Sequence, residues 1–248
     1  QGAAAPDDDN GLMARYYRAP LATRAICSLN VFFYVLGALV LPMLGDMMTA
    51  CPMDILYLQV WRLFTSPLVS RSILSLAIGC FVFGQLGSQF ERGFGTIGFV
   101  YVFMLFTAAA NALFTVATLV VAPMAPAANL IGPQGCSQGL WVPVMAFLVV
   151  QAQRSTSPNM SVMGMCNIPT KLYPWLLVFA FGMLGSPILD NLCGIAVGYA
   201  FHYGYLQRVL PTEGRFQAWE QSSRLRWLYT APGHISWTGG VYTPGGSG

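Results

Sequence analysis

The sequence predicts an all-α polytopic membrane protein, and three observations support this fold class. Hydrophobic residues make up 55% of the 248 residues and charged residues only 8%, whereas soluble domains carry roughly 25% charged residues. The mean hydropathy is +0.57. Apolar runs alternate with polar loops, and most runs approach the ~20 residues needed to cross a bilayer core.

We expect three parts: a polar N-terminal arm (1–24), a six-helix membrane domain (25–206) and a polar, aromatic C-terminal tail (207–248). The spans are predicted at 24–44, 72–90, 96–121, 138–153, 172–184 and 188–206. Pro143 predicts a kink or a local unwinding in the fourth span, and Pro174 suits the first turn of the fifth. The first loop, 45–71, suits an interfacial or re-entrant segment. Residues 154–171 are predicted to form a polar loop.

Charge predicts the orientation in the membrane. Six spans place both termini on one side, which then holds ten basic residues: Arg15, Arg18, Arg24, Arg92, Arg154, Lys171, Arg208, Arg215, Arg224 and Arg226. The other side holds Arg62 and Arg71. The positive-inside rule therefore predicts that both termini face the cytosol or the mitochondrial matrix. The net charge of +3 is thinly spread and gives no support for nucleic-acid binding.

The cysteines give no sign of a disulfide framework or a metal site, and the N-terminal residues give no sign of a signal peptide. The six cysteines are scattered, mostly within apolar runs: Cys27, Cys51, Cys80, Cys136, Cys166 and Cys193. We therefore expect small buried side chains, with no disulfide framework and no metal site. The chain opens on QGAAAPDDDN, so no cleavable signal peptide is expected, and processing of the N-terminus stays open.

The least typical stretch for a membrane helix is 129–144, NLIGPQGCSQGLWVPV. It opens an apolar segment with three glycines, a proline, a serine and two glutamines. Polar groups inside a bilayer need partners, so this stretch predicts either a polar site or a former site that has lost its chemistry. Elsewhere, Glu91, Arg92 and Asp190 have simpler interpretations as interfacial anchors, helix caps or loop-stabilising residues.

Five motifs in order resemble the rhomboid superfamily, in its derlin-like and ubiquitin-associated-domain pseudoprotease branch. They are APLATR, LQVWRLFTSPL, QFERGFGTIGFVYVFMLF, SQGLWVPVMAFLVV and DNLCGIAVGYAF. The resemblance covers about 17–206 and implies a rhomboid-like six-helix bundle. It also implies structural roles for the matching motif residues, Trp61, Arg62, Glu91, Arg92, Gly95, Gly139, Gly194 and Gly198.

An active rhomboid carries a serine in a GxSG box at the fourth span and a histidine in the sixth. Three registers align the box here, placing Gln134, Gln138 or Ser137 at the nucleophile position, and Asn191 replaces the histidine. His202 follows eleven residues later on the same helix, about 16 Å away, and His234 lies in the tail. We therefore expect no catalytic dyad, because asparagine cannot take the serine proton. Gln134, Ser137, Gln138 and Asn191 form either a polar plug or a surviving substrate pocket.

The tail is predicted to bind a partner through aromatic and arginine side chains, which protein interfaces favour: Trp219, Arg224, Trp227, Tyr229 and Trp237. A membrane-surface segment is the alternative. We expect a catalytically inactive scaffold or accessory subunit in a stable complex of membrane proteins, with no cofactor beyond bound lipids. The alternatives are a derlin-like quality-control factor and an atypical serine protease. The mitochondrial inner membrane and the endoplasmic reticulum both fit.

Overall fold

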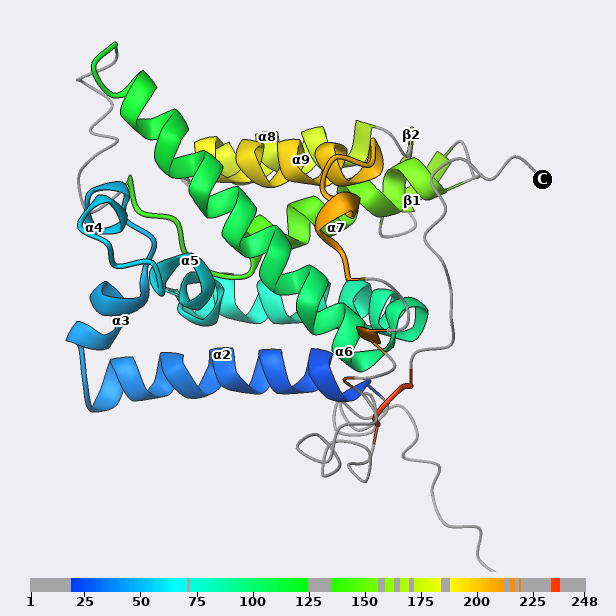
Figure 1. The fold of residues 1–248 in the computed structure, drawn as a ribbon, viewed down its shortest axis with the longest axis horizontal. Coiled ribbons are helices and arrows are strands. Elements are labelled where there is room, and N and C mark those ends of the chain that lie inside the picture. The colour runs from blue at the N-terminus through cyan, green and yellow to red at the C-terminus, as the bar shows by residue number, and fades with distance from the viewer. Residues whose placement is uncertain are drawn as a thin grey trace, which may run out of the picture.

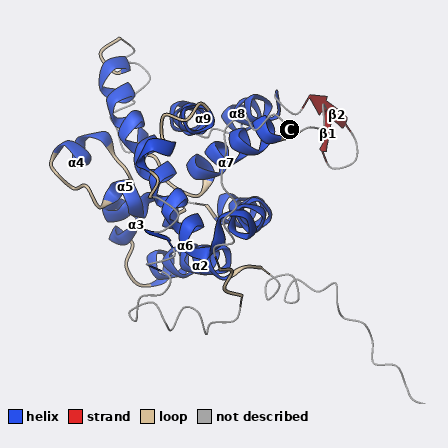
Figure 2. Cartoon of the chain, turned by 45° about the vertical axis from the view of Figure 1, so that its right-hand side comes forward, coloured by secondary structure: helices blue, strands red, loops and turns tan. Residues whose placement is uncertain are grey.

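The computed structural model describes residues 19–70, 72–124, 135–155, 159–162, 166–169, 172–183, 188–211, 215–216, 219 and 233–236. Its helices are α2 (Leu21–Leu39), α3 (Met43–Met48), α4 (Pro52–Leu56), α5 (Arg62–Thr65), α6 (Ile73–Val121), α7 (Trp141–Arg154), α8 (Tyr173–Met183) and α9 (Ile188–His202). Two short 3-10 helices are η1 (Ser66–Leu68) and η5 (Gln207–Val209). The strands β1 (Asn159–Val162) and β2 (Cys166–Pro169) form an antiparallel hairpin. The hairpin projects from one side of the helical bundle (Figure 2).

The predicted helical fold class is confirmed in its main feature, with one correction. The segment expected as a polar loop between α7 and α8 contains the β1–β2 hairpin, so the chain is mostly helical rather than all-α. Within the described residues, α2 and α6 are long and apolar enough to cross a membrane. Helices α7, α8 and α9 have 14, 11 and 15 residues, fewer than the ~20 of a full span. Six spans therefore stay a prediction.

Prolines set two boundaries differently from the prediction. Helix α2 ends at Leu39 instead of residue 44, because Pro42 lacks an N–H and disfavours helical backbone at the residue before it. The expected kink or unwinding at Pro143 is wrong, because α7 is one helix from Trp141 to Arg154. Pro143 lies in the first turn of α7, where an N–H has no acceptor within the helix, so its absence costs little. Pro174 is the second residue of α8, as predicted.

Helix α6 consists of two limbs that meet at Gly95. The helix runs past Phe90, where the second span was expected to end, and breaks only at Gly95 with φ 71° and ψ 164°. A positive φ is strained for side-chain-bearing residues, so glycine suits this corner. In Figure 1, α2 lies along the first limb, while the second limb crosses the molecule towards α8 and α9.

The core is centred on Phe147 of α7. Its ring lies 4.7 Å from that of Phe90 and 4.9 Å from that of Phe106, so it joins both limbs of α6. Helix α9 approaches the backbone of α7 closely: a Cβ at Gly198 would lie 2.7 Å from the Ala146 carbonyl oxygen. A Cβ at Gly194 would lie 2.6 Å from the Val142 oxygen. Glycine at these two positions therefore permits the α7–α9 packing.

Candidate functional site

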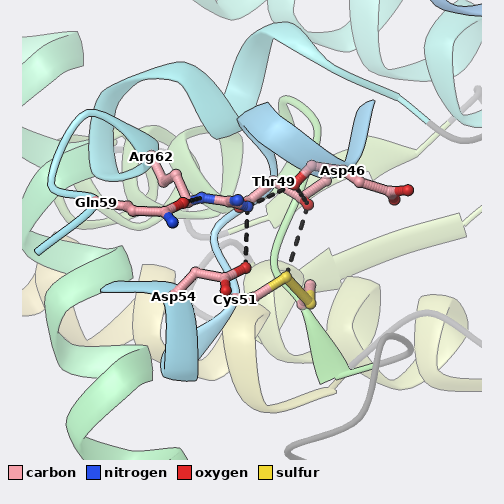
Figure 3. Close-up of a disulfide and its surroundings, with 7 residues drawn as sticks. Asp46, Thr49, Cys51, Asp54, Gln59 and Arg62 are labelled. Carbon is pink, nitrogen blue, oxygen red and sulfur yellow. Dashed lines mark hydrogen bonds and ion pairs between the residues drawn. A yellow bond between two sulfur atoms is a disulfide. The ribbon is translucent and has the colours of Figure 1, made fainter. Parts of the chain in front are cut away.

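The segment before α7 is attached to the first loop by backbone pairing and a disulfide. The Ala50 N–H donates to the Ser137 carbonyl at 2.9 Å, and the Ser137 N–H donates to the Ala50 carbonyl at 3.0 Å. Beside this bridge, Cys51 and Cys136 form a disulfide (Figure 3). The expectation that these two cysteines are isolated hydrophobic side chains is therefore wrong. They lie 85 residues apart in sequence, and only the fold brings them together.

Arg62 holds the first loop in the shape that this bridge requires. Its Nη1 donates to the carbonyl of Asp46 and, at 2.9 Å, to that of Thr49. Its Nε donates to Gln59 at 2.6 Å, and Asp54 lies 3.2 Å from its Nη1 (Figure 3). Thr49 precedes Ala50, which pairs with Ser137. The buried guanidinium therefore supports the Ser137 segment indirectly, by fixing the backbone next to Ala50. Trp61, its motif neighbour, is 53% exposed.

Two asparagines that the sequence analysis did not single out fix the end of the first loop. Asn30 of α2 donates to the Pro67 carbonyl at 2.6 Å. Asn111 of α6 donates to the Ser66 hydroxyl at 2.7 Å, and the Ser66 carbonyl accepts from the Gly139 N–H. A single asparagine inside a long apolar run is the signal that could have identified each of them. Gly139 itself has φ +81°, which suits glycine at the turn into α7.

Ser137 lies next to the start of α9. Its hydroxyl is buried and lies near the Asp190 carboxyl group. The distance and angles between the two groups do not meet the criteria for a hydrogen bond, and the hydroxyl has no other partner among the described residues. The Asp190 carboxyl oxygen accepts from the Asn191 N–H at 2.6 Å. Ser137, Asp190 and Asn191 are thus brought together, with Gln138 beside them in sequence, whereas Gln134 lies outside the described residues.

Neither histidine of the chain lies in this cluster. His202 is the last residue of α9, eleven residues from Asn191 and therefore about 16 Å along the helix. His234 lies beside Gly233, whose carbonyl accepts from the Leu21 N–H at the start of α2. The start of α2 packs against the Glu91 end of the bundle, far along α2 from the Asn30 contact with the first loop. The cluster therefore has Asp190 as its one described carboxyl group and no imidazole.

Glu91 organises the opposite end of the bundle. Its carboxylate accepts hydrogen bonds from the backbone N–H groups of Ala22 and Thr23, both at 2.8 Å. The hydroxyls of Thr23 and Thr96 donate to it at the same distance. A negative charge at a helix N-terminus satisfies unpaired N–H groups and complements the helix dipole. Glu91 is thus a helix cap for α2, one of the roles considered from sequence, whereas Arg92 is exposed.

Part of the tail docks at the same end. The Thr96 N–H donates to the Ile235 carbonyl at 2.9 Å, and the Ile235 N–H donates to the Thr96 hydroxyl at 3.0 Å. Trp219 is 41% exposed and its ring lies 6.3 Å from that of Tyr101 on α6. The other predicted partner-binding residues, Arg224, Trp227, Tyr229 and Trp237, lie outside the described residues. The tail therefore contacts the membrane domain of its own chain.

Several curated proteins are similar to this chain. Rhomboid-like protein 15 of Arabidopsis thaliana is 28% identical over 73% of the chain, which spans 46% of that relative. Rhomboid-type serine protease 2 of Gibberella zeae is 29% identical over 92% of the chain and 83% of the relative. Derlin-1.2 of Zea mays is 23% identical over 62% of the chain and 59% of the relative. The chain thus covers less than half the length of the first of these proteins.

The similarity to these relatives, together with the close packing of α9 on α7 at glycines, defines the class of the protein. It is a rhomboid-like integral membrane protein of the derlin and rhomboid branch. Residues 24–209 match the family described as eukaryotic integral membrane protein, DUF1751. The chain belongs to this family. The predicted resemblance is therefore confirmed, and the match includes the first loop, both limbs of α6 and the Ser137 segment.

Proposed function

We propose that the protein is a catalytically inactive rhomboid-like scaffold that binds other membrane proteins. One observation carries this proposal: Ser137 is buried beside Asp190, and both histidines of the chain lie elsewhere. A serine nucleophile needs an adjacent base to remove its proton. Ser137 is also pinned by Ala50 and by the neighbouring disulfide, so it belongs to the support of the first loop.

The first loop offers a surface for binding. Five of its exposed apolar side chains share one short stretch beside Arg62: Leu56, Tyr57, Leu58, Val60 and Trp61. Leu58 has φ 66°, a left-handed conformation that costs roughly 1–2 kcal/mol for a residue with a side chain. Strained backbone of this kind persists where the surroundings hold it, and it clusters at functional segments. The Arg62 contacts, the strained residue and the exposed aromatic rings together support a preformed docking loop.

The disulfide supports a location in the secretory pathway. Disulfides persist in oxidising compartments such as the lumen of the endoplasmic reticulum. The proposed six-span topology places the first loop and the Ser137 segment on the side with few basic residues, away from the cytosol. Derlin relatives also fit the endoplasmic reticulum, so we propose this location, with both termini cytosolic. A derlin-like quality-control role is the second candidate, since it requires the same location and the same loop.

Two measurements test the proposal. A fluorophosphonate probe applied to intact membranes should leave Ser137 unlabelled, and labelling that Ser137→Ala and Asp190→Asn both abolish would establish a protease instead. Native gels of the protein in mild detergent should show a band of fixed stoichiometry with membrane-protein partners. Trp61→Ala should weaken that band, while the control Phe179→Ala, on an exposed position of α8, should not. A changing mixture of clients with a ubiquitin ligase would favour quality control.

A further inference from the structure

An open groove lies between α2 and the first limb of α6. Its volume is about 690 Å³. Helix α2 lines it with one stripe, from Arg24 through Cys27 and Ser28 to Val31. Helix α6 lines it with a second stripe that includes Ala77, Phe81, Gly84, Ser88 and Arg92. None of these residues belongs to the Ser137 cluster, so the groove is a separate site.

The groove has a cationic end and an apolar end. Arg24 and Arg92 lie at one end, with Ser88 one helical turn from Arg92. Val31, Ala77 and Phe81 lie at the other end, and none of the described residues that line the groove is acidic. The thiol of Cys27 contacts the Cys80 carbonyl oxygen at 3.7 Å across the two helices. The groove therefore changes from charged to apolar along its length, in the same order as a lipid molecule changes from headgroup to acyl chain.

Length and charge both fit a phospholipid. The fifteen steps along the helix from Ala77 to Arg92 rise about 22 Å, which exceeds the ~15 Å of hydrocarbon in one leaflet. A Cβ added at Gly84 would meet no atom within 4 Å, so the middle of the groove is open to an acyl chain. We propose that this groove binds one anionic phospholipid, with its phosphate at Arg24 and Arg92 and an acyl chain against Gly84, Phe81 and Val31.

Native mass spectrometry of the full chain in detergent, titrated with phosphatidylserine or phosphatidylcholine, tests the site. One phosphatidylserine should bind preferentially. The double variant Arg24→Gln/Arg92→Gln should weaken it about 25-fold, at roughly fivefold for each basic residue, and should leave phosphatidylcholine unaffected. Gly84→Leu should remove binding of both lipids by filling the groove. Gly37→Leu is the matched control, since a Cβ there also meets nothing within 4 Å and lies outside the groove.

Thermal unfolding of each variant in the same detergent separates loss of the site from loss of the fold. Equal affinities for the two lipids, or undiminished binding by Gly84→Leu, would overturn the proposal. A membrane protein that co-purifies without lipid and is released by Gly84→Leu would also overturn it, because the occupant would then be a partner helix. The proposal depends on the α2–α6 groove alone, so it survives if the scaffold function fails.

Discussion

The carboxylate of Glu91 accepts two hydrogen bonds from Thr23, one from its backbone N–H and one from its hydroxyl, each at 2.8 Å. These two residues lie 68 positions apart, and their contact fixes the start of α2 against the end of the first limb of α6. A Cβ added at the neighbouring Gly87 would meet the Thr23 hydroxyl at 3.0 Å, so close packing accompanies the polar contact.

Glu91→Ala should lower the free energy of unfolding by about 3 kcal/mol, because it leaves the N–H groups of Ala22 and Thr23 buried without an acceptor. Glu91→Gln should cost less, since one oxygen can still accept. Thermal unfolding in detergent measures both changes. Gln89→Ala, at an exposed position one half-turn away, is the control and should change stability little. Equal stability of Glu91→Ala and the control would contradict the capping role.

Thr96→Val should weaken the docking of the tail segment and lower the unfolding free energy by about 1–2 kcal/mol, while the backbone hydrogen bond from residue 96 to the Ile235 carbonyl remains. The hydroxyl of Thr96 donates to Glu91 and accepts from the Ile235 N–H, and valine does neither. Limited proteolysis should cut the tail of the variant faster than that of the parent. Thr118→Val is a matched control, because the buried Thr118 hydroxyl has no partner among the described residues. Identical cleavage rates in the two variants would argue against docking through Thr96.

Reduction of the denatured protein should release two further thiols, from Cys51 and Cys136. The double variant Cys51→Ser/Cys136→Ser should show no such release and should be less stable by about 2–4 kcal/mol. Thiol labelling followed by gel electrophoresis counts the groups. Cys193→Ala removes a free cysteine and should leave the two-thiol difference unchanged. An unaltered thiol count on reduction of the parent protein would rule out the disulfide.

Arg62→Lys should loosen the first loop although it keeps the charge. A lysine cannot reproduce the planar group that contacts Thr49, Gln59 and Asp54 together. The Cys51–Cys136 bond should therefore be reduced faster by a soluble phosphine in the folded protein. Val60→Ala, at an exposed position in the same loop, should leave the rate unchanged. A lysine variant that resists reduction like the parent would show that Arg62 does not hold this segment.

Gly198→Leu should destabilise the protein by about 2–3 kcal/mol, because its Cβ would lie 2.8 Å from the Cβ of Val149 and closer still to backbone. Ala196→Leu adds a side chain of the same size to the exposed face of α9 and should be tolerated. Comparing the midpoints of thermal unfolding for the two variants isolates the α7–α9 contact. Equal midpoints would mean that these helices can separate without loss of stability.

Local sequence features predicted much of the fold. Apolar runs and their glycine and proline boundaries located the helices, because hydrophobic length and backbone freedom are properties of short segments. They failed where context decides the outcome: Pro143 is tolerated in a first turn, and the segment that contains β1 and β2 pairs with itself. The candidate site was located from its motifs, and Ser137 and Asn191 do lie together beside Asp190.

The sequence by itself determined that this is a helical membrane protein of the rhomboid-like branch, and it predicted a degenerate site at Gln134, Ser137, Gln138 and Asn191. Only the tertiary structure decided which cysteines pair, what Glu91 caps and where the tail docks. These contacts join residues 85, 68 and 139 positions apart. Hydrogen bonds and disulfides form between groups that are close in space, and one amino-acid sequence does not show which distant residues the fold brings together.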